Sequence, residues 1–297
     1  MKTRRALWIL AAAAVCFALM ALAAKLAAAR LSGGEVAFLR FAFMLLPLLA
    51  VPRLARRAVE FQRLDLLIYR GVFGGLAVLL YFLAMAHIPV GVATLLTYTA
   101  PVFSVTFAAL FLGERADRRL LVPLVAALVG MALAAGGAGA GGTAGAGGGF
   151  LSLGRWEVVG MVSAVFSGAA LAAIRAARRT ESSWSVYGSF SLCGLLSTAP
   201  FALAGFQRPT PREWLLLLGV GLSSVAAQLL MTYAYRWATN LEAGVLSQLT
   251  PALSILFGAV FLGDRPTPLQ VGGMLLTLAG VIGVVALQGS GRGEGVS

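Results

Sequence analysis

The chain contains the same passage twice, 150 positions apart. Residues 81–134 correspond to residues 231–284, and the register continues upstream without a gap because Lys25 falls on Arg175. Self-similarity at a fixed period indicates a duplicated structural unit. Any fold for this sequence must therefore be built from two related units of about 150 residues.

The composition predicts that each unit lies in a membrane. Hydrophobic residues make up 60% of the chain and charged residues only 11%. Stretches of about 20 apolar residues are long enough to cross a hydrocarbon core of about 30 Å. Because helices satisfy their own backbone groups in lipid, we expect an all-α integral membrane protein with five transmembrane helices in each copy. The predicted spans are residues 6–29, 35–52, 66–87, 90–112, 119–136, 156–177, 184–205, 213–235, 241–262 and 268–287.

The basic residues predict the orientation of these spans. If the amino terminus is cytoplasmic, fifteen loop or terminal Lys and Arg residues fall on the cytoplasmic side, against five on the other. This imbalance follows the positive-inside rule, so both termini are expected in the cytoplasm and the protein in the plasma (inner) membrane. The net charge of +12 is not gathered on one soluble face, so no nucleic-acid partner is expected. The five residues on the outer side are Arg30, Arg155, Arg208, Arg212 and Arg265.

An odd number of spans in each copy means that the second copy enters the membrane upside down. Two inverted-topology five-helix repeats are typical of secondary transporters, with a substrate site near the midplane between the repeats. We expect a first repeat at 1–135, a Gly/Ala-rich linker at 136–154, a second repeat at 155–288 and a cytoplasmic tail at 289–297. The basic and apolar start of the chain also fits a signal peptide, but the repeat assigns residues 6–29 to a retained span.

The sequence gives no sign of an enzyme. It contains neither HExxH nor GxSxG, and its single histidine, His87, lies at a predicted helix end. The glycines at 137, 139 and 142 match a dinucleotide-binding pattern, but that pattern needs a strand before it and a helix after it. A flexible linker explains these glycines, and no cofactor or metal is expected.

The chain resembles the EamA-type transporters of the drug/metabolite transporter (DMT) superfamily. The resemblance rests on residues 101–114 and 251–264, which run from a proline to Leu-Gly-Glu and Leu-Gly-Asp at the end of the fourth span of each copy. Lys25 and Arg40 also fit the usual pattern. The resemblance implies a ten-helix bundle that moves small organic molecules such as amino acids, commonly outward. Asp264 departs from the glutamate that is more common there.

Two prolines near the centres of spans four and nine predict kinks. Pro101 and Pro251 each leave the carbonyl four residues earlier without its helical partner. Opened backbone at the midplane is tolerated where it faces protein or a cavity, which makes the neighbouring polar side chains candidates for substrate binding. The alternative is a kink satisfied locally by hydroxyl groups. These candidates are Thr97, Tyr98, Ser247 and Gln248.

Further candidates come from spans one, two, three and eight. Gln228 and Thr232 share one helix face, and Tyr81 lies on the matching span of the first copy. Charges inside the hydrophobic layer are functional candidates by default, and we expect only Lys25 and Arg40 to lie there. Arg40 is expected to hold a carboxylate or phosphate through its planar fork, although both side chains could instead extend to the headgroups.

We expect a secondary transporter, with export of small organic metabolites as the favoured activity. No acidic residue is predicted deep in a span, which disfavours a proton antiporter built on a buried carboxylate. A lipid flippase and a non-transporting scaffold are the alternatives. The expected partners are a small-molecule solute, membrane lipid and, as an open alternative, a second copy of the chain in a homodimer.

Overall fold

The computed structural model describes residues 2–104, 107, 118–136, 154–177, 180–234 and 246–290. Residues 137–153 of the predicted linker, the tail beyond residue 290, the end of the predicted fourth span with its Leu-Gly-Glu motif, and the start of the ninth span lie outside the described residues. The side chains of Arg175 and Thr232 lie outside them as well.

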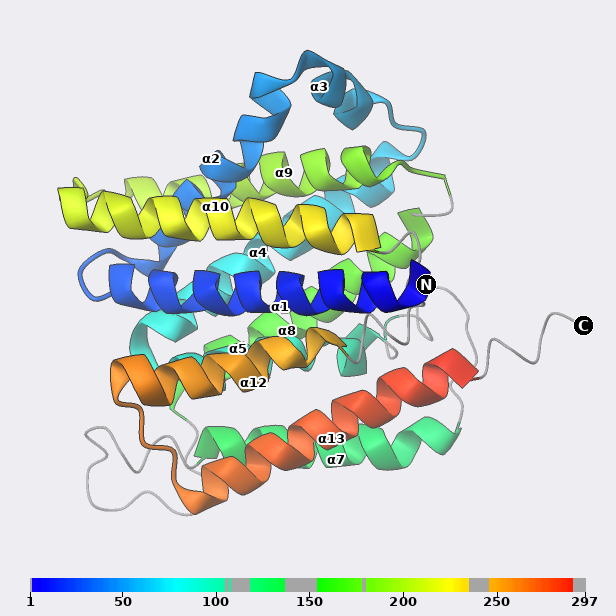
Figure 1. Cartoon of the computed structure of the whole chain (residues 1–297), viewed down its shortest axis with the longest axis vertical. Coiled ribbons are helices and arrows are strands. Elements are labelled where there is room, and N and C mark those ends of the chain that lie inside the picture. Colours follow the sequence, from blue (N-terminus) through cyan, green and yellow to red (C-terminus); the bar gives the residue numbers. More distant parts are fainter. Residues whose placement is uncertain are drawn as a thin grey trace, which may run out of the picture.

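The described part of the chain is helical, as Figure 1 shows. Seven helices are long and apolar enough to cross a membrane, and three further apolar segments (Val90–Ser104, Leu121–Ala134 and Leu249–Leu262) are shorter. The prediction of an all-helical membrane protein is confirmed. The helices are α1 (Lys2–Ala27), α2 (Gly33–Ala50), α3 (Pro52–Val59), α4 (Leu64–His87), α5 (Val90–Tyr98), α7 (Leu121–Gly136), α8 (Arg155–Ala177), α9 (Ser183–Leu203), α10 (Pro211–Ala234), α12 (Leu249–Phe257) and α13 (Pro268–Ser290), with short turns η1 (Arg118–Leu120) and η3 (Gly258–Leu262).

Helices of one copy pack against helices of the other. The closest helix pairs join one copy to the other: α1 with α10, α4 with α8, α2 with α9, α5 with α12, and α7 with α13. The largest apolar cluster lies at the centre and includes Phe82, Met85, Leu96 and Leu217. In Figure 1, α1 begins and α13 ends at the same end of the bundle, which we call the termini side; the other end is the opposite side.

Side-chain caps fix where several helices begin. Ser32 and Glu35 form a reciprocal capping box at α2, in which each side chain bonds to the backbone N–H of the other residue. Thr210 and Glu213 make the same exchange at α10. These caps satisfy N–H groups that a helix start leaves without partners.

The fourth and ninth predicted spans are interrupted near their prolines. α5 ends at Tyr98, where Thr99 forms a turn with its N–H and its hydroxyl both bonded to the Leu96 carbonyl, and the helix resumes before Pro101. In the second copy a turn at Gln248 precedes Pro251 by three residues. Both interruptions leave short helical pieces, so α5 and α12 are only nine residues long.

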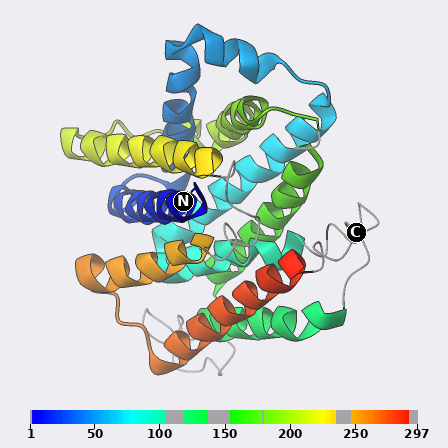
Figure 2. The ribbon, with the colours of Figure 1, turned by 45° about the vertical axis from the view of Figure 1, so that its right-hand side comes forward.

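Two features of the fold were not foreseen. One is α3, a short helix with exposed arginines between the predicted second and third spans, visible at the top of Figure 1. The other is the contact between α7 and α13, which lie side by side at one edge in Figures 1 and 2. A Cβ atom at Gly130 would collide with the backbone at Gly273 and Thr277, so the two helices touch backbone to backbone.

Candidate functional site

Arg40 is the best-placed of the predicted site residues. It lies on α2, is 4% exposed, and donates from Nε to the Ser224 hydroxyl of α10 at 3.0 Å. Its Nη1 has no acceptor among the described residues. The guanidinium carbon lies 5.1 Å from the ring centre of Phe41 and 5.9 Å from that of Phe190. A planar cation between aromatic rings retains some electrostatic stabilisation without a carboxylate partner.

Tyrosines surround this arginine. Tyr81 is buried on α4 and its hydroxyl shares a hydrogen bond of 2.9 Å with Thr94 of α5. Tyr81, Tyr98 and Tyr187 all lie within electrostatic range of Arg40. Tyr187 of α9 donates to the Met44 carbonyl at 2.7 Å, which ties α9 to α2. The structure thus brings Arg40, Tyr81 and Tyr98 into one region between the two copies.

Arg70 is a buried charge that the sequence interpretation did not include among its candidates. It lies on α4, six residues after the helix begins, and is only 9% exposed, so the assignment of Lys25 and Arg40 alone to the hydrophobic layer is wrong. Its guanidinium carbon sits 4.1 Å from the centre of the Phe190 ring. Gly74 leaves room for this side chain, because a Cβ there would collide with Arg70 Nη1. The distance of Arg70 from the helix start was the available signal.

The remaining predicted residues lie on α5, on α10 and at the turn before α12. Thr97 shares a hydrogen bond of 3.2 Å with Ser163 of α8. Gln248 is buried and donates to the Ser247 hydroxyl at 3.3 Å, while its neighbour Thr250 donates to a carbonyl of α1. Gln228 is buried on α10, one turn beyond Ser224 and therefore on the same face. The backbone of Thr232 continues this face, but its side chain lies outside the described residues.

Lys25 closes the opposite side of the bundle rather than facing the centre. Its ammonium group donates to the carbonyls of Met85 at 2.7 Å and Ile88 at 2.9 Å, where α4 ends. A cation at a helix C-terminus satisfies carbonyls that have no partner within the helix. Lys25 also lies within electrostatic range of Asp264.

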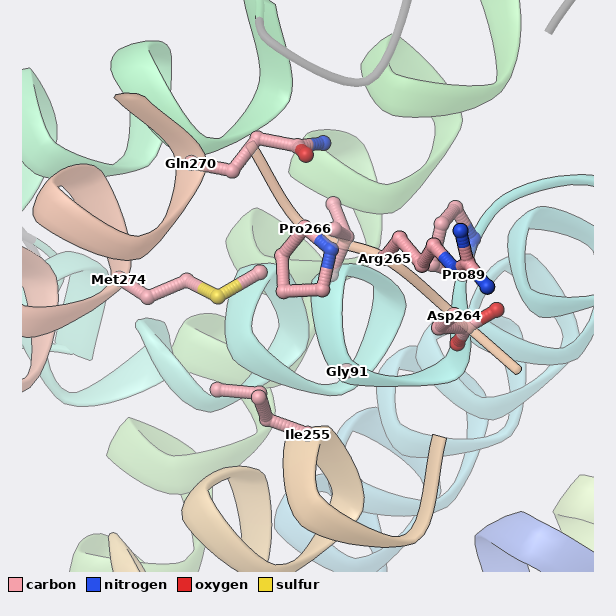
Figure 3. Close-up of a pocket in the computed structure, with 9 residues that line it drawn as sticks. Pro89, Gly91, Ile255, Asp264, Arg265, Pro266, Gln270 and Met274 are labelled. Atoms are coloured by element: carbon pink, nitrogen blue, oxygen red, sulfur yellow. The ribbon is translucent and has the colours of Figure 1, made fainter. Parts of the chain in front are cut away.

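The Leu-Gly-Asp motif at residues 262–264 ends the helical segment η3. Gly263 adopts φ +72°, the left-handed conformation that ends a helix, and the Asp264 N–H bonds to the Gly258 carbonyl at 3.0 Å. Figure 3 shows Asp264, Arg265 and Pro266 crossing over the start of α5 near Pro89. The cavity beneath them has a volume of about 40 Å³, far below the 300–1,000 Å³ that is typical of a small-molecule site.

An ion pair and a hydrogen bond add to the contacts on this side of the bundle. Arg30 donates to Glu213 from Nε at 2.6 Å and from Nη2 at 2.5 Å, and this hydrogen bonding raises the pKa of the arginine. Glu35 accepts from the Gln207 N–H at 2.5 Å, so one capping carboxylate also joins α2 to the loop before α10. Gly33 at the start of α2 lies so close to the end of α4 that a Cβ would collide with the Phe82 carbonyl.

The termini side contains a much larger cavity. Its volume is about 760 Å³, within the range of a metabolite site. Three elements form its wall: the end of α3, the start of α9 and the end of α10. The lining residues are Arg57, Glu60, Ser182, Ser183, Trp184, Leu229, Leu230 and Tyr233.

Known proteins resemble this chain in sequence, and one solved structure resembles it in fold. The chain is 31% identical to the pseudopaline exporter CntI of Pseudomonas aeruginosa (strain UCBPP-PA14), over 90% of this chain and 91% of that protein. It is 29% identical to a probable terminal-alkyne amino-acid exporter of Streptantibioticus cattleyicolor, over 66% of this chain and 64% of that protein. A crystal structure with 21% sequence identity shares the fold with a TM-score of 0.60, covering 97% of this chain and 99% of the other.

The family match covers both copies separately. Residues 4–136 and residues 154–286 each match the EamA-like transporter family. The two matched segments begin 150 positions apart, which is the period of the internal repeat. The chain therefore belongs to the EamA-like transporter family, and it is a multi-pass membrane transporter of the DMT superfamily rather than an enzyme.

Proposed function

We propose that this protein is a secondary transporter that exports small organic metabolites, such as amino acids, by alternating access between two inverted repeats. In this proposal residues 1–135 and 155–288 form the repeats, each with five spans, and residues 136–154 link them. Residues 289–297 form a tail in the cytoplasm, where the amino terminus also lies. The proposed location is the plasma (inner) membrane.

The observation that carries this proposal is a difference between two equivalent places in the copies. Gly33 at the start of α2 packs against the end of α4 at Leu83, with no room for a Cβ. Their equivalents 150 positions later are Ser183 at the start of α9 and Tyr233 at the end of α10. Ser183 and Tyr233 both line the 760 Å³ cavity. In the first copy α2 and α4 are therefore packed together at these positions. In the second copy the cavity lies between the equivalent parts of α9 and α10.

This difference is what alternating access requires. When two similar halves adopt different conformations, exchanging those conformations closes one side of the bundle and opens the other. The described contacts on the opposite side, made by Lys25, Arg30 and Glu35, belong to the closed arrangement. The proposed cycle breaks these contacts and brings α9 against α10.

The proposed direction of transport and the proposed class of solute rest on the named relatives and on the placement of basic residues. Two relatives are named as exporters, one of pseudopaline and one of a terminal-alkyne amino acid. Arg57 of α3 lines the cavity on the termini side, which supports a cytoplasmic placement of that side by the positive-inside rule. The large cavity then faces the cytoplasm, where an exporter collects its substrate.

Metabolite profiling tests this function. Medium and cells of a deletion strain are compared with those of a strain that overexpresses the protein. We expect at least one small organic solute to accumulate in the medium on overexpression and inside the cells on deletion. Unchanged small-molecule profiles together with an altered distribution of lipid between the leaflets would overturn the proposal in favour of a lipid flippase.

A further inference from the structure

Within the described part of the chain, the buried arginines Arg40 and Arg70 have no carboxylate partner, which such groups normally have. Among the described residues, ion pairs join Arg30 to Glu213 and Arg63 to Asp65, both near the ends of helices. Arg40 Nη1 and Arg70 Nε are buried without an acceptor in the described chain. Arginine stays charged in proteins, and a buried unpaired charge costs several kcal/mol. A second positive charge beside the first adds repulsion to this cost.

Both cations are directed to one aromatic ring. Phe190 has Arg70 at 4.1 Å from its centre and Arg40 at 5.9 Å. Phe41 meets the Phe190 ring edge-on at 5.1 Å, and Gly194 makes space for Phe41 because a Cβ there would collide with that ring. The helices α2, α4 and α9 therefore hold the two guanidinium groups in fixed positions around an apolar wall.

A face of α9 leads from this cluster to the large cavity. Trp184 lines the cavity, Tyr187 follows one turn later and Phe190 one turn after that, so the three rings lie along one side of the helix. Trp184 and Tyr187 contact each other edge to face at 6.0 Å between centres. From Trp184 to Phe190 the helix rises only about 9 Å. A solute in the cavity is therefore about two helical turns from the arginines.

We propose that Arg40 and Arg70 form the binding site for a small organic dianion, with Arg40 Nη1 and Arg70 Nε as its hydrogen-bond donors. Two positive charges are balanced by two negative ones, and guanidinium groups match carboxylate and phosphate oxygens in geometry. Phe41, Phe82 and Phe190 contact the apolar part of the solute. This proposal rests on the transport function above and adds the substrate class to it.

Purified protein in nanodiscs tests the site through the melting temperature, since a ligand that binds only the folded state raises it. The probes are succinate and glutamate as carboxylates, inorganic phosphate, and uncharged succinamide. We expect at least one anionic probe to raise the melting temperature of the wild type, and succinamide to leave it unchanged. A shift with phosphate alone indicates that the site accepts a phosphate group, and a shift with succinate or glutamate indicates that it accepts a carboxylate. No shift with any of the anions would overturn the proposal.

Variants separate a binding role from a structural one. Arg70→Gln removes an unpaired buried charge, so the ligand-free variant should melt no lower than the wild type while its anion-induced shift disappears. Arg53→Gln, on exposed α3, is the control and should keep the full shift. If Arg70→Gln melts far lower or does not fold, Arg70 is structural and the proposal fails for that residue. Arg40→Lys with Arg70→Lys keeps both charges but loses the planar forks, and should bind at least tenfold more weakly.

Export assays keep this proposal distinct from the transport function. A solute found by profiling should be exported by the Arg53→Gln strain and not by the Arg70→Gln strain. Full export by Arg70→Gln would overturn the anion site and leave the transport function standing. If profiling finds no solute that the wild type exports, the transport function itself fails, whatever the anion probes show.

Discussion

Arg40 and Phe190 occupy equivalent positions in the two copies, 150 residues apart, and the guanidinium carbon of one lies 5.9 Å from the ring centre of the other. The same relation links their partners, because Ser224, which accepts from Arg40, is equivalent to Gly74, which makes room for Arg70 beside Phe190. Two copies that began alike now present a cation and an aromatic ring to each other. Divergence at matched positions has therefore made the centre of the bundle asymmetric.

Gly74→Ala should disrupt the placement of Arg70. The added methyl group collides with Arg70 Nη1, so the guanidinium group must leave its position over the Phe190 ring, a contact worth about 0.5–2 kcal/mol. Gly272→Ala is the matched control, because a Cβ at that exposed helix position meets nothing within 4 Å. We expect Gly74→Ala to lower the melting temperature and reduce export, while Gly272→Ala leaves both unchanged. Equal melting temperatures for the two variants would contradict the close approach.

Lys25→Met should weaken the closed arrangement on the opposite side. The substitution leaves the carbonyls of Met85 and Ile88 without their charged donor, and such hydrogen bonds contribute about 1.5–3 kcal/mol each. Arg212→Met, an exposed change on the same side, is the control. Thermal unfolding in nanodiscs should show a lower melting temperature for Lys25→Met alone. A similar small change in both variants would show that Lys25 does not hold the end of α4.

The pair of Arg30 and Glu213 should show partial rescue by charge exchange. Arg30→Glu places two carboxylates together and should lower both melting temperature and export. The double change Arg30→Glu with Glu213→Arg restores the attraction, but it loses the bonds from Thr210 to Glu213 that cap α10. We therefore expect recovery of part of the loss, and a smaller effect in high salt because exposed charges are screened. No recovery in the double variant would indicate that capping alone matters.

Joining α9 to α10 across the large cavity should stop transport. Cysteines at Ser183 and Tyr233, introduced after Cys16 and Cys193 are replaced by alanine, face the same cavity. A bifunctional maleimide that links them fixes the width of the cavity, which the proposed cycle must change. Export should fall to the level of the deletion strain, whereas each single cysteine variant treated alike stays active. Full export after complete cross-linking would exclude movement of these helix ends.

Much of the fold could be predicted from sequence because lipid restricts the choices. Apolar stretches such as 66–87 had to be helices, and α4 covers Leu64–His87. The short helix α3 was not predicted, because Arg53, Arg56 and Arg57 make it polar and it has only eight residues. Hydrophobicity locates what crosses a membrane, and it gives no signal for helices that lie outside the apolar layer.

The site was harder to predict because equal patterns lead to different environments. Lys25 and Arg40 looked alike in sequence, each about five residues from a span end. In the fold Lys25 reaches the carbonyls of α4, whereas Arg40 is held between Phe41 and Phe190. Arg70 joins them only through packing of α4 on α9, which sequence spacing does not reveal. Tertiary contacts, rather than depth along a helix, decide which charge is available to a solute.

In the contact between α7 and α13, equivalent residues of the two copies make equivalent contacts. Gly130 meets Gly273 and Thr277, and its equivalent Gly280 meets Pro123 and Ala127, which are the equivalents of those two residues. Self-complementary contacts of this kind define an isologous interface, the form in which identical subunits pair about a twofold axis. The chain thus carries within one polypeptide the interface of a symmetric dimer. Two separately expressed halves have, in this pair of helices, a surface by which to reassemble.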